Sequence, residues 1–118
     1  MNQLIERYVS LAINHGERIL SGDSKDANRI HLKLTNAIED IKNSSSQVKK
    51  EFYNLLTHEN DSVKIWTAVT LLKTFESKSI EILQSVSCRN NIFGLSAKTS
   101  IDCWKKGLMN NITDWHKS

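Results

Sequence analysis

The residues of this chain that could take part in acid–base, nucleophilic or metal chemistry are few and widely separated. The four histidines are His15, His31, His58 and His116. They do not stand at the spacings of metal ligands relative to one another, and a zinc site would need one of them beside Cys88 and Cys103. The sequence contains no Gly-rich phosphate loop and no HExxH, Cys-x-x-Cys or Gly-x-Ser-x-Gly motif. We therefore predict a protein that is not an enzyme and that uses no cofactor or metal.

The same residue types have ordinary structural roles in a helical protein. Cys88 and Cys103 stand in predicted helices among apolar neighbours, which favours reduced, buried side chains that pack as small hydrophobic residues. His15 falls on the apolar arc of its helix, where a hydrogen-bonded core histidine is the simpler interpretation. Trp66 and Trp104 also lie on apolar faces at helical spacing, and we expect both in the core rather than on a stacking surface.

Length and composition are those of one globular domain. The chain has 118 residues, of which 39% are hydrophobic and 25% charged, and it has four glycines and no proline. The net charge of +3 comes from scattered residues rather than a basic stripe, so nucleic acid is not the expected partner. The N-terminal MNQLIERYVS lacks the apolar run of a signal peptide, and no apolar stretch of 18 residues exists. We expect a single cytoplasmic domain over 1–118, with a tail from about residue 108 whose Trp115 folds back onto the body.

Apolar residues recur at helical spacing along the chain. They predict six helices joined by short polar corners, at residues 3–20, 25–42, 46–56, 63–74, 76–90 and 90–107. Asp23 or Ser24 is placed to cap the second helix, and one of Asn60, Asp61 and Ser62 is placed to cap the fourth. No alternating run is long enough for a strand, so the expected fold class is all-α.

The fourth helix, 63–74, is apolar around most of its circumference, which is typical of a helix packed between neighbours. Its one polar seam consists of Thr67, Thr70 and Thr74. The segment FYNLLTHENDSVKIWTAVTLLKT, which contains this helix, has the order of two helices in a HEAT-type repeat. The stretch 80–107 repeats this plan, with the small residue Ala97 where helices of adjacent layers approach closely. Such units stack into a right-handed superhelix.

The segments DANRIHLKL, VKIWTAVTLL and GLSAKTSIDCWKKG, in this order and at these spacings, resemble a bacterial family of small HEAT-like proteins, the domain of unknown function DUF2019. The resemblance extends over residues 5–108. It implies a HEAT-like α–α right-handed superhelix of about six helices. The polar NSSS linker and the mild positive charge depart from the pattern expected of the family.

Members of such families often look like immunity proteins, which bind and neutralise the bacterial toxin domain encoded beside them. The resemblance therefore implies a non-enzymatic protein-binding module whose partner is a cognate toxin domain. Immunity proteins against nucleases are usually acidic, whereas this chain is basic. A nuclease partner would thus require a local acidic patch, such as Glu39 and Asp40.

Residues that break the pattern of their own helix are candidates for contact with a partner. Leu32 stands on the polar face of the second helix, although a lone exposed leucine is also common on protein surfaces. With the threonine seam and a polar strip on the sixth helix, it would line one concave surface. The candidate partner-binding residues are Asn28, Leu32, Thr35, Glu39, Thr67, Thr70, Thr74, Lys98, Asp102 and Lys105. Arg29 is instead expected to tie neighbouring helices together through a carbonyl or carboxylate.

Two other functions fit the same scaffold. One is a generic HEAT-like adaptor for an unrelated protein. The other is nucleic-acid binding of the kind found in HEAT-like DNA glycosylases, which are considerably longer and use a basic concave groove. Three helix pairs would span too little duplex to grip it, and a salt-dependent affinity for DNA would be the sign of this function.

Overall fold

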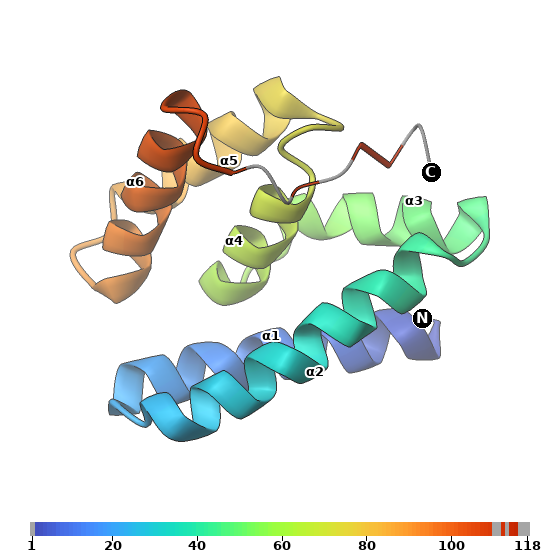
Figure 1. The fold of residues 1–118 in the computed structure, drawn as a ribbon, viewed down its shortest axis with the longest axis horizontal. Coiled ribbons are helices and arrows are strands. Elements are labelled where there is room, and N and C mark those ends of the chain that lie inside the picture. The colour runs from blue at the N-terminus through green and yellow to red at the C-terminus, as the bar shows by residue number, and fades with distance from the viewer. Residues whose placement is uncertain (1, 110–111, 113, 116–118) are drawn as a thin grey trace. The chain divides into compact units, whose positions relative to one another are not determined.

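The structure is a computed structural model that describes residues 2–109, 112, 114 and 115. Within these residues the chain forms helices and turns, without a β-strand (Figure 1). The helices are α1 (Gln3–Ser21), α2 (Ser24–Lys42), α3 (Ser46–Asn54), the 3₁₀ turn η1 (Leu55–Thr57), α4 (Asp61–Thr70), α5 (Glu76–Ser87) and α6 (Ile92–Lys105). The predicted all-α class with six α-helices is confirmed for this part of the chain.

The chain divides into two compact units, Met1–Asn54 and Leu55–Ser118. The boundary falls where α3 gives way to η1, inside the segment predicted as one continuous helix over 46–56. Leu55 and Leu56 are nevertheless buried, as their place on the predicted apolar face requires. The expectation of a single domain stays a prediction.

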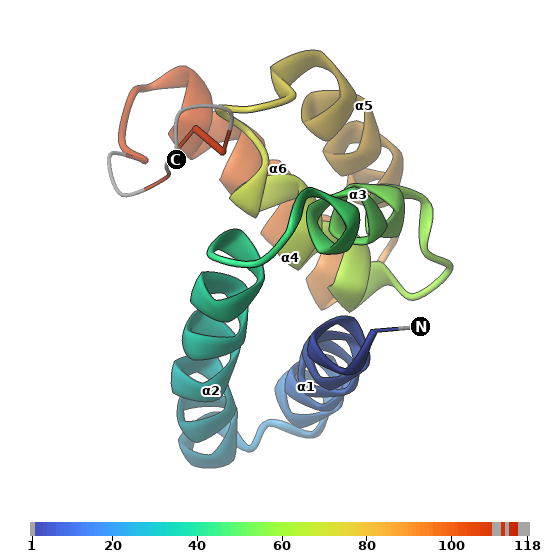
Figure 2. The ribbon, with the colours of Figure 1, turned by 90° about the vertical axis from the view of Figure 1, so that its right-hand side faces the viewer.

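In the first unit α1 and α2 lie side by side as an antiparallel pair, and α3 packs against both (Figure 1, Figure 2). The apolar stripes of the three helices supply the core, because side chains three and four residues apart share one helix face. Its buried apolar side chains are Ile5, Tyr8, Ala12, Ala27, Ile30, Leu34, Ala37, Ile41, Val48 and Phe52. The rings of Tyr8 and Phe52 join α1 to α3 edge to face, with centroids 5.0 Å apart and planes at 65°.

The turn between α1 and α2 is closed by Gly22 and Asp23. Gly22 has a φ of 77°, a left-handed conformation that ends α1 and that glycine adopts without steric cost. The side chain of Asp23 accepts a hydrogen bond from the backbone N–H of Asp26, so Asp23 is the cap of α2, one of the two predicted alternatives.

Asp26 ties the two helices together on the solvent side of this turn. Its carboxylate accepts hydrogen bonds from the guanidinium of Arg18 on α1, with Nε 2.6 Å from Oδ2, and from Arg29 on α2. The hydrogen bond from Arg18, then the one from Arg29, hold the pKa of Asp26 below its ordinary value. Arg29 does act through a carboxylate, that of Asp26, but the prediction that Arg29 joins neighbouring helices is wrong, because Asp26 stands on the same helix and the link to α1 is made by Arg18.

In the second unit α4 packs against both α5 and α6, which also pack against each other. Val63, Ala68, Leu71 and Leu72 are completely buried, which confirms that this segment lies among neighbours. The predicted helix over 63–74 is however shifted. It begins at Asp61 because the Asn60 side chain accepts the backbone N–H of Val63, and it ends at Thr70, where turns from Leu71 onward replace it.

The connection from α5 to α6 brings two stretches of backbone unusually close. A Cβ atom built on Gly94 would collide with the backbone carbonyl oxygen of Arg89. The side chain of Arg89 in turn reaches Asp61 in the first turn of α4, with Nε 3.0 Å from Oδ2. The absence of a side chain at Gly94 therefore lets the corner fold tightly, and the ion pair ties that corner to α4.

Ser79 on α5 is completely buried, and its hydroxyl lacks a hydrogen-bond partner among the residues that the structure describes. A buried unsatisfied hydroxyl is destabilising. We expect Ser79→Ala to raise the free energy of unfolding by about 1 kcal/mol, measured by urea denaturation. Ser85→Ala, an exposed position on the same helix, is the control and should change it by less than about 0.5 kcal/mol. A loss of stability in Ser79→Ala would mean that the hydroxyl has a partner in solution.

The half-buried His15 on α1 makes the stability of the protein depend on pH. Burial, and then the nearby His31 on α2, lower the pKa of His15 from its ordinary 6.5. The two rings have centroids 6.3 Å apart. Since the folded chain then binds a proton less readily than the unfolded chain, stability is greatest above pH 6.5 and falls as the pH drops through 6.5 towards the lowered pKa.

We therefore expect the free energy of unfolding to fall between pH 7.5 and pH 5, and His15→Gln to reduce this fall. His31→Gln removes only the second cause of the shift, so it should retain most of the dependence on His15. The free energy of unfolding of the parent and of both variants is measured by denaturant titration at several pH values. Equal slopes in the parent and in His15→Gln would contradict the assignment to His15.

The described helices include none that is both long and apolar enough to cross a bilayer. Beyond α6 the chain turns at Gly107, whose φ is 71°, as predicted for the end of this helix. The backbone N–H of Trp115 donates to the hydroxyl of Thr74, with N and Oγ1 2.9 Å apart, and the Trp115 side chain is 3% exposed. The prediction that Trp115 folds back is therefore confirmed.

Candidate functional site

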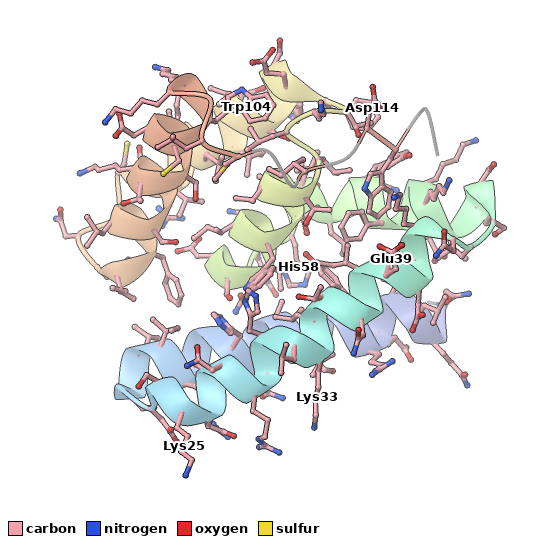
Figure 3. The ribbon with its side chains drawn as sticks, viewed as in Figure 1. Lys25, Lys33, Glu39, His58, Trp104 and Asp114 are labelled. Atoms are coloured by element: carbon pink, nitrogen blue, oxygen red, sulfur yellow. The ribbon has the colours of Figure 1, made fainter. Side chains whose placement is uncertain are left out.

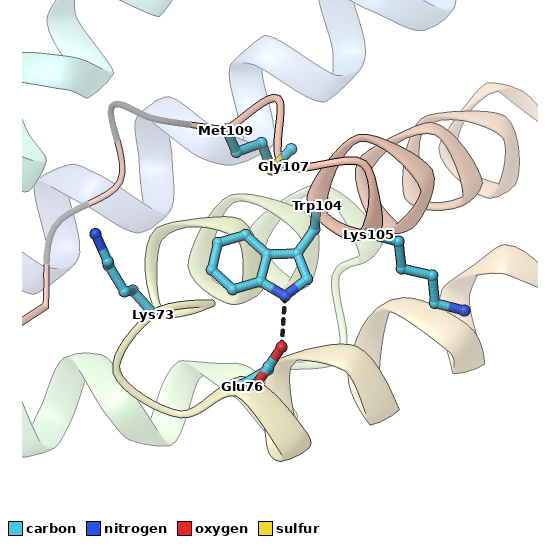
Figure 4. A pocket seen from close by; sticks show the side chains of 6 residues that line it. All are labelled: Lys73, Glu76, Trp104, Lys105, Gly107 and Met109. Atoms are coloured by element: carbon cyan, nitrogen blue, oxygen red, sulfur yellow. Dashed lines mark hydrogen bonds between the residues drawn. The ribbon is translucent and has the colours of Figure 1, made fainter.

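An open pocket of about 470 Å³ lies in the second unit, where the end of α6 meets the start of α5 (Figure 4). It is lined by Lys73, Glu76, Trp104, Lys105, Gly107 and Met109. These residues come from three places: the turns after α4, the first turn of α5, and the last turn of α6 with the segment that follows it. Because the ends of three helical segments meet here, the pocket is lined by both charged and apolar side chains.

The centre of the pocket is the hydrogen bond between the indole of Trp104 and the carboxylate of Glu76. Trp104 donates from Nε1 to Oε2 of Glu76 over 2.7 Å, as the dashed line in Figure 4 shows. Trp104 is half-buried, so the prediction that it lies in the core is wrong. Its helix ends one residue later, and the ring lies beside the first residue of α5, where it lines the open pocket.

Glu76 is the first residue of α5, where the positive end of the helix dipole favours a carboxylate. The cap residue before it, Phe75, contributes no side-chain hydrogen bond to the helix end. Glu76 therefore carries the favourable charge interaction at this end of the helix, and at the same time it fixes the orientation of the indole.

Lys73 and Lys105 extend on opposite sides of the indole (Figure 4). Both are exposed, and neither forms an ion pair with a residue that the structure describes. Lys106, the neighbour of Lys105, behaves differently, because its ammonium group lies 2.9 Å from the carboxylate of Asp102. The pocket therefore carries two lysine charges that no carboxylate of the described chain pairs with.

The predicted contact residues on α2 are all exposed. Leu32 is 67% exposed, and Asn28, Thr35 and Glu39 are exposed beside it on the helix shown in Figure 3. Thr35 donates its hydroxyl to the backbone carbonyl of His31, and Glu39 lies 3.5 Å from the side-chain amide of Asn43. These four residues form the α2 surface, in which one large apolar side chain stands among polar ones.

The predicted threonine seam is only partly accessible: Thr70 and Thr74 are half-buried, and Thr67 does not reach the surface. Thr67 is completely buried, so its assignment to an exposed seam is wrong. Thr70 donates its hydroxyl to the backbone carbonyl of Trp66, and the hydroxyl of Thr74 accepts the backbone N–H of Trp115. A helix packed against α5 and α6 buries its polar side as well as its apolar ones, and the hydroxyls then bond to nearby backbone.

The predicted strip on α6 is exposed, as its position on the helix indicates. Its members are Lys98, Asp102 and Lys105. Asp102 is held by Lys106, and Lys105 lines the pocket. The strip and the pocket belong to the second unit and the α2 surface to the first, so the candidate residues are distributed over both units.

Sequence reasoning missed Lys73, Glu76 and Met109 as pocket residues. The indole of Trp104 and the carboxylate of Glu76 are 28 positions apart, and their meeting depends on how α5 and α6 pack. A weak signal was available, because Trp104 lies within one turn of a helix end that the glycine at 107 marks. A large aromatic residue at such a place often lies at the surface.

The cysteines are arranged differently from the prediction. Cys88 is exposed, because α5 ends at Ser87 and leaves it just outside the helix, and Cys103 is half-buried. Both are free thiols. The described residues contain no group of three or more His, Cys, Asp or Glu side chains that could hold a metal ion.

Comparison of the chain with models of protein families, with curated proteins and with solved structures finds no match.

Proposed function

We propose that this chain is a non-enzymatic protein-binding module of the bacterial cytoplasm, most specifically an immunity protein that neutralises a cognate toxin domain. The observation that carries the binding proposal is the pocket around Trp104, where an indole is accessible beside two lysines that form no ion pair with the described residues. Tryptophan is enriched among the residues that dominate binding energy at protein interfaces. The α2 surface around Leu32 is a second candidate contact area.

The toxin as partner is drawn from the resemblance of three segments of the chain to the DUF2019 family. We also propose, on the same basis, that the helix pairs form a HEAT-like right-handed superhelix. The pairing of α1 with α2 and of α5 with α6 supports this proposal, as do the buried small residues Ala27, Gly94 and Ala97 on these helices.

The test is a growth assay in bacteria that express the C-terminal domain of the protein encoded immediately upstream. The proposal expects this domain to stop growth and co-expression of the present chain to restore it. Toxicity that persists when the chain is well expressed would exclude the immunity function for that partner. A pull-down with the chain as bait would then test the remaining proposal, an adaptor for another protein.

Once a partner is identified, two variants show which surface of this chain it contacts. We expect Trp104→Ala and Leu32→Asp each to weaken binding of the partner by about tenfold or more if its contact area includes that residue. Leu32 is exposed, so Leu32→Asp should change the melting temperature little. Trp104 is half-buried and bonded to Glu76, so a melting curve must show that Trp104→Ala still folds before its affinity is compared. Affinities are measured by calorimetry, with Lys25→Ala on α2 as a control. A partner that binds both variants as tightly as the parent uses neither surface.

A further inference from the structure

We propose that the pocket around Trp104 accepts an acidic segment of the partner protein, in which a carboxylate side chain stands beside an apolar or aromatic one. This inference rests on the proposed function, since it names the chemistry of the partner that the module would recognise. The charges and side-chain types that line the pocket support it.

The charge left unpaired in the pocket is positive. Glu76 is the one carboxylate among the lining residues, and its Oε2 already accepts the indole N–H of Trp104. Lys73 and Lys105 contribute two ammonium groups without an ion-pair partner in the described chain. A carboxylate placed beside either ammonium group, next to the indole, gains a charge-assisted hydrogen bond that no described carboxylate of the chain supplies.

The rest of the lining is mainly the Trp104 ring and the Met109 side chain, which offer an apolar surface and no free hydrogen-bond donor. The only polar atom of the indole, Nε1, is used by Glu76, so the ring offers its face and edge to an incoming group. Met109 adds a polarizable thioether on the side of the ring opposite Glu76, as Figure 4 shows. Such a lining suits an aliphatic or aromatic side chain, which removes apolar area from water when it binds.

Other occupants satisfy only part of this lining. A lysine or arginine of a partner could lie over the indole face, but Lys73 on one side of the ring and Lys105 on the other would each repel its charge. A free small anion would contact the lysines and leave the indole and Met109 exposed. A carboxylate next to an apolar side chain uses both features, and it fits the basic net charge of the chain.

The experiment follows the indole N–H of Trp104 by NMR in the full-length ¹⁵N-labelled chain. The three tryptophans give three indole signals, and the signal lost in Trp104→Phe identifies the pocket. The probes are the dipeptides acetyl-Phe-Asp-amide, acetyl-Phe-Asn-amide and acetyl-Phe-Lys-amide, with sodium acetate as a fourth titrant. We expect saturable shifts with the aspartate peptide, and a dissociation constant about tenfold higher for the asparagine peptide.

Charge-reversal variants provide the matched control. Lys73→Glu with Lys105→Glu should abolish the shift caused by the aspartate peptide. Lys25→Glu with Lys33→Glu makes the same change of net charge on α2, where both side chains point away from the helix pair (Figure 3), and it should bind as the parent does. Melting curves check that all variants fold, as expected from the exposure of the four lysines.

Equal binding of the three peptides, or stronger binding of the lysine peptide, would overturn the inference. So would saturable shifts with acetate at the same concentrations, because the pocket would then be a site for small anions. No shift with any titrant overturns it as well. Growth rescue without peptide binding would leave the proposed function standing and remove only this assignment of the pocket.

Discussion

Ala97→Glu is expected to unfold the protein or to reduce its free energy of unfolding by about 4 kcal/mol or more. Ala97 is completely buried on α6, which packs against both α4 and α5. A glutamate there would bury a carboxylate without a cation beside it and force apart helices that meet at a methyl group. Since small domains are stable by only about 5–15 kcal/mol, a loss of this size approaches the whole stability.

Ser96→Glu is the matched control, because Ser96 precedes Ala97 on the same helix and is exposed. It introduces the same charge at the surface and should change stability by less than about 0.5 kcal/mol. Ala97→Leu adds volume without charge, and it separates the steric cost from the cost of the buried carboxylate. Urea denaturation and near-UV circular dichroism are the measurements. A variant Ala97→Glu that melts as the parent does would show that α6 faces solvent at this position.

Gly94→Ala is expected to destabilise the protein by about 1–3 kcal/mol, although alanine is the better helix former. The intrinsic preference of a helix for alanine over glycine is about 1 kcal/mol and would favour the variant. Against it stands the backbone carbonyl of Arg89, which the new methyl group would strike. A backbone carbonyl cannot rotate aside as the end of a long side chain can, so the corner from α5 to α6 must open.

The consequences of this opening extend to the ion pair at the corner. Arg89 holds Asp61 at the start of α4, and a shift of its backbone would lengthen that contact. Leu95→Ala, at an exposed position next in the chain, is the control for changes of helix propensity. The measurement is the urea midpoint at constant m value. An unchanged or higher midpoint in Gly94→Ala would contradict the close approach of the two backbones.

The helices and most of the core could be predicted from the sequence. Leu34, Leu83 and Ala97 are buried as the apolar stripes of their helices indicate, because the helical period alone decides which side chains share a face. Asp23 and Asn60 cap their helices for an equally local reason, since a side-chain oxygen there reaches the backbone N–H three residues later.

The wrong predictions of burial concern residues whose exposure does not follow from the apolar pattern of their own helix. Thr67 is polar and lies opposite an apolar stripe, yet it is buried because α4 is covered on more than one side. Cys88 was assigned to the core, yet it is exposed because its helix ends one residue earlier. The local pattern predicts which side chains share a helix face. Where a helix ends and which neighbours cover it then determine which of those side chains reach solvent.

The candidate site shows the same division between local pattern and packing. The sequence by itself determined six helices, the caps of α2 and α4, and the exposed strip on α6 to which Lys105 belongs. The tertiary structure alone decided that Lys73, Glu76 and Trp104 meet around one pocket. Helical periodicity is repeated every few residues and can be read along the chain, whereas the meeting of helix ends depends on the angles and distances at which α4, α5 and α6 pack.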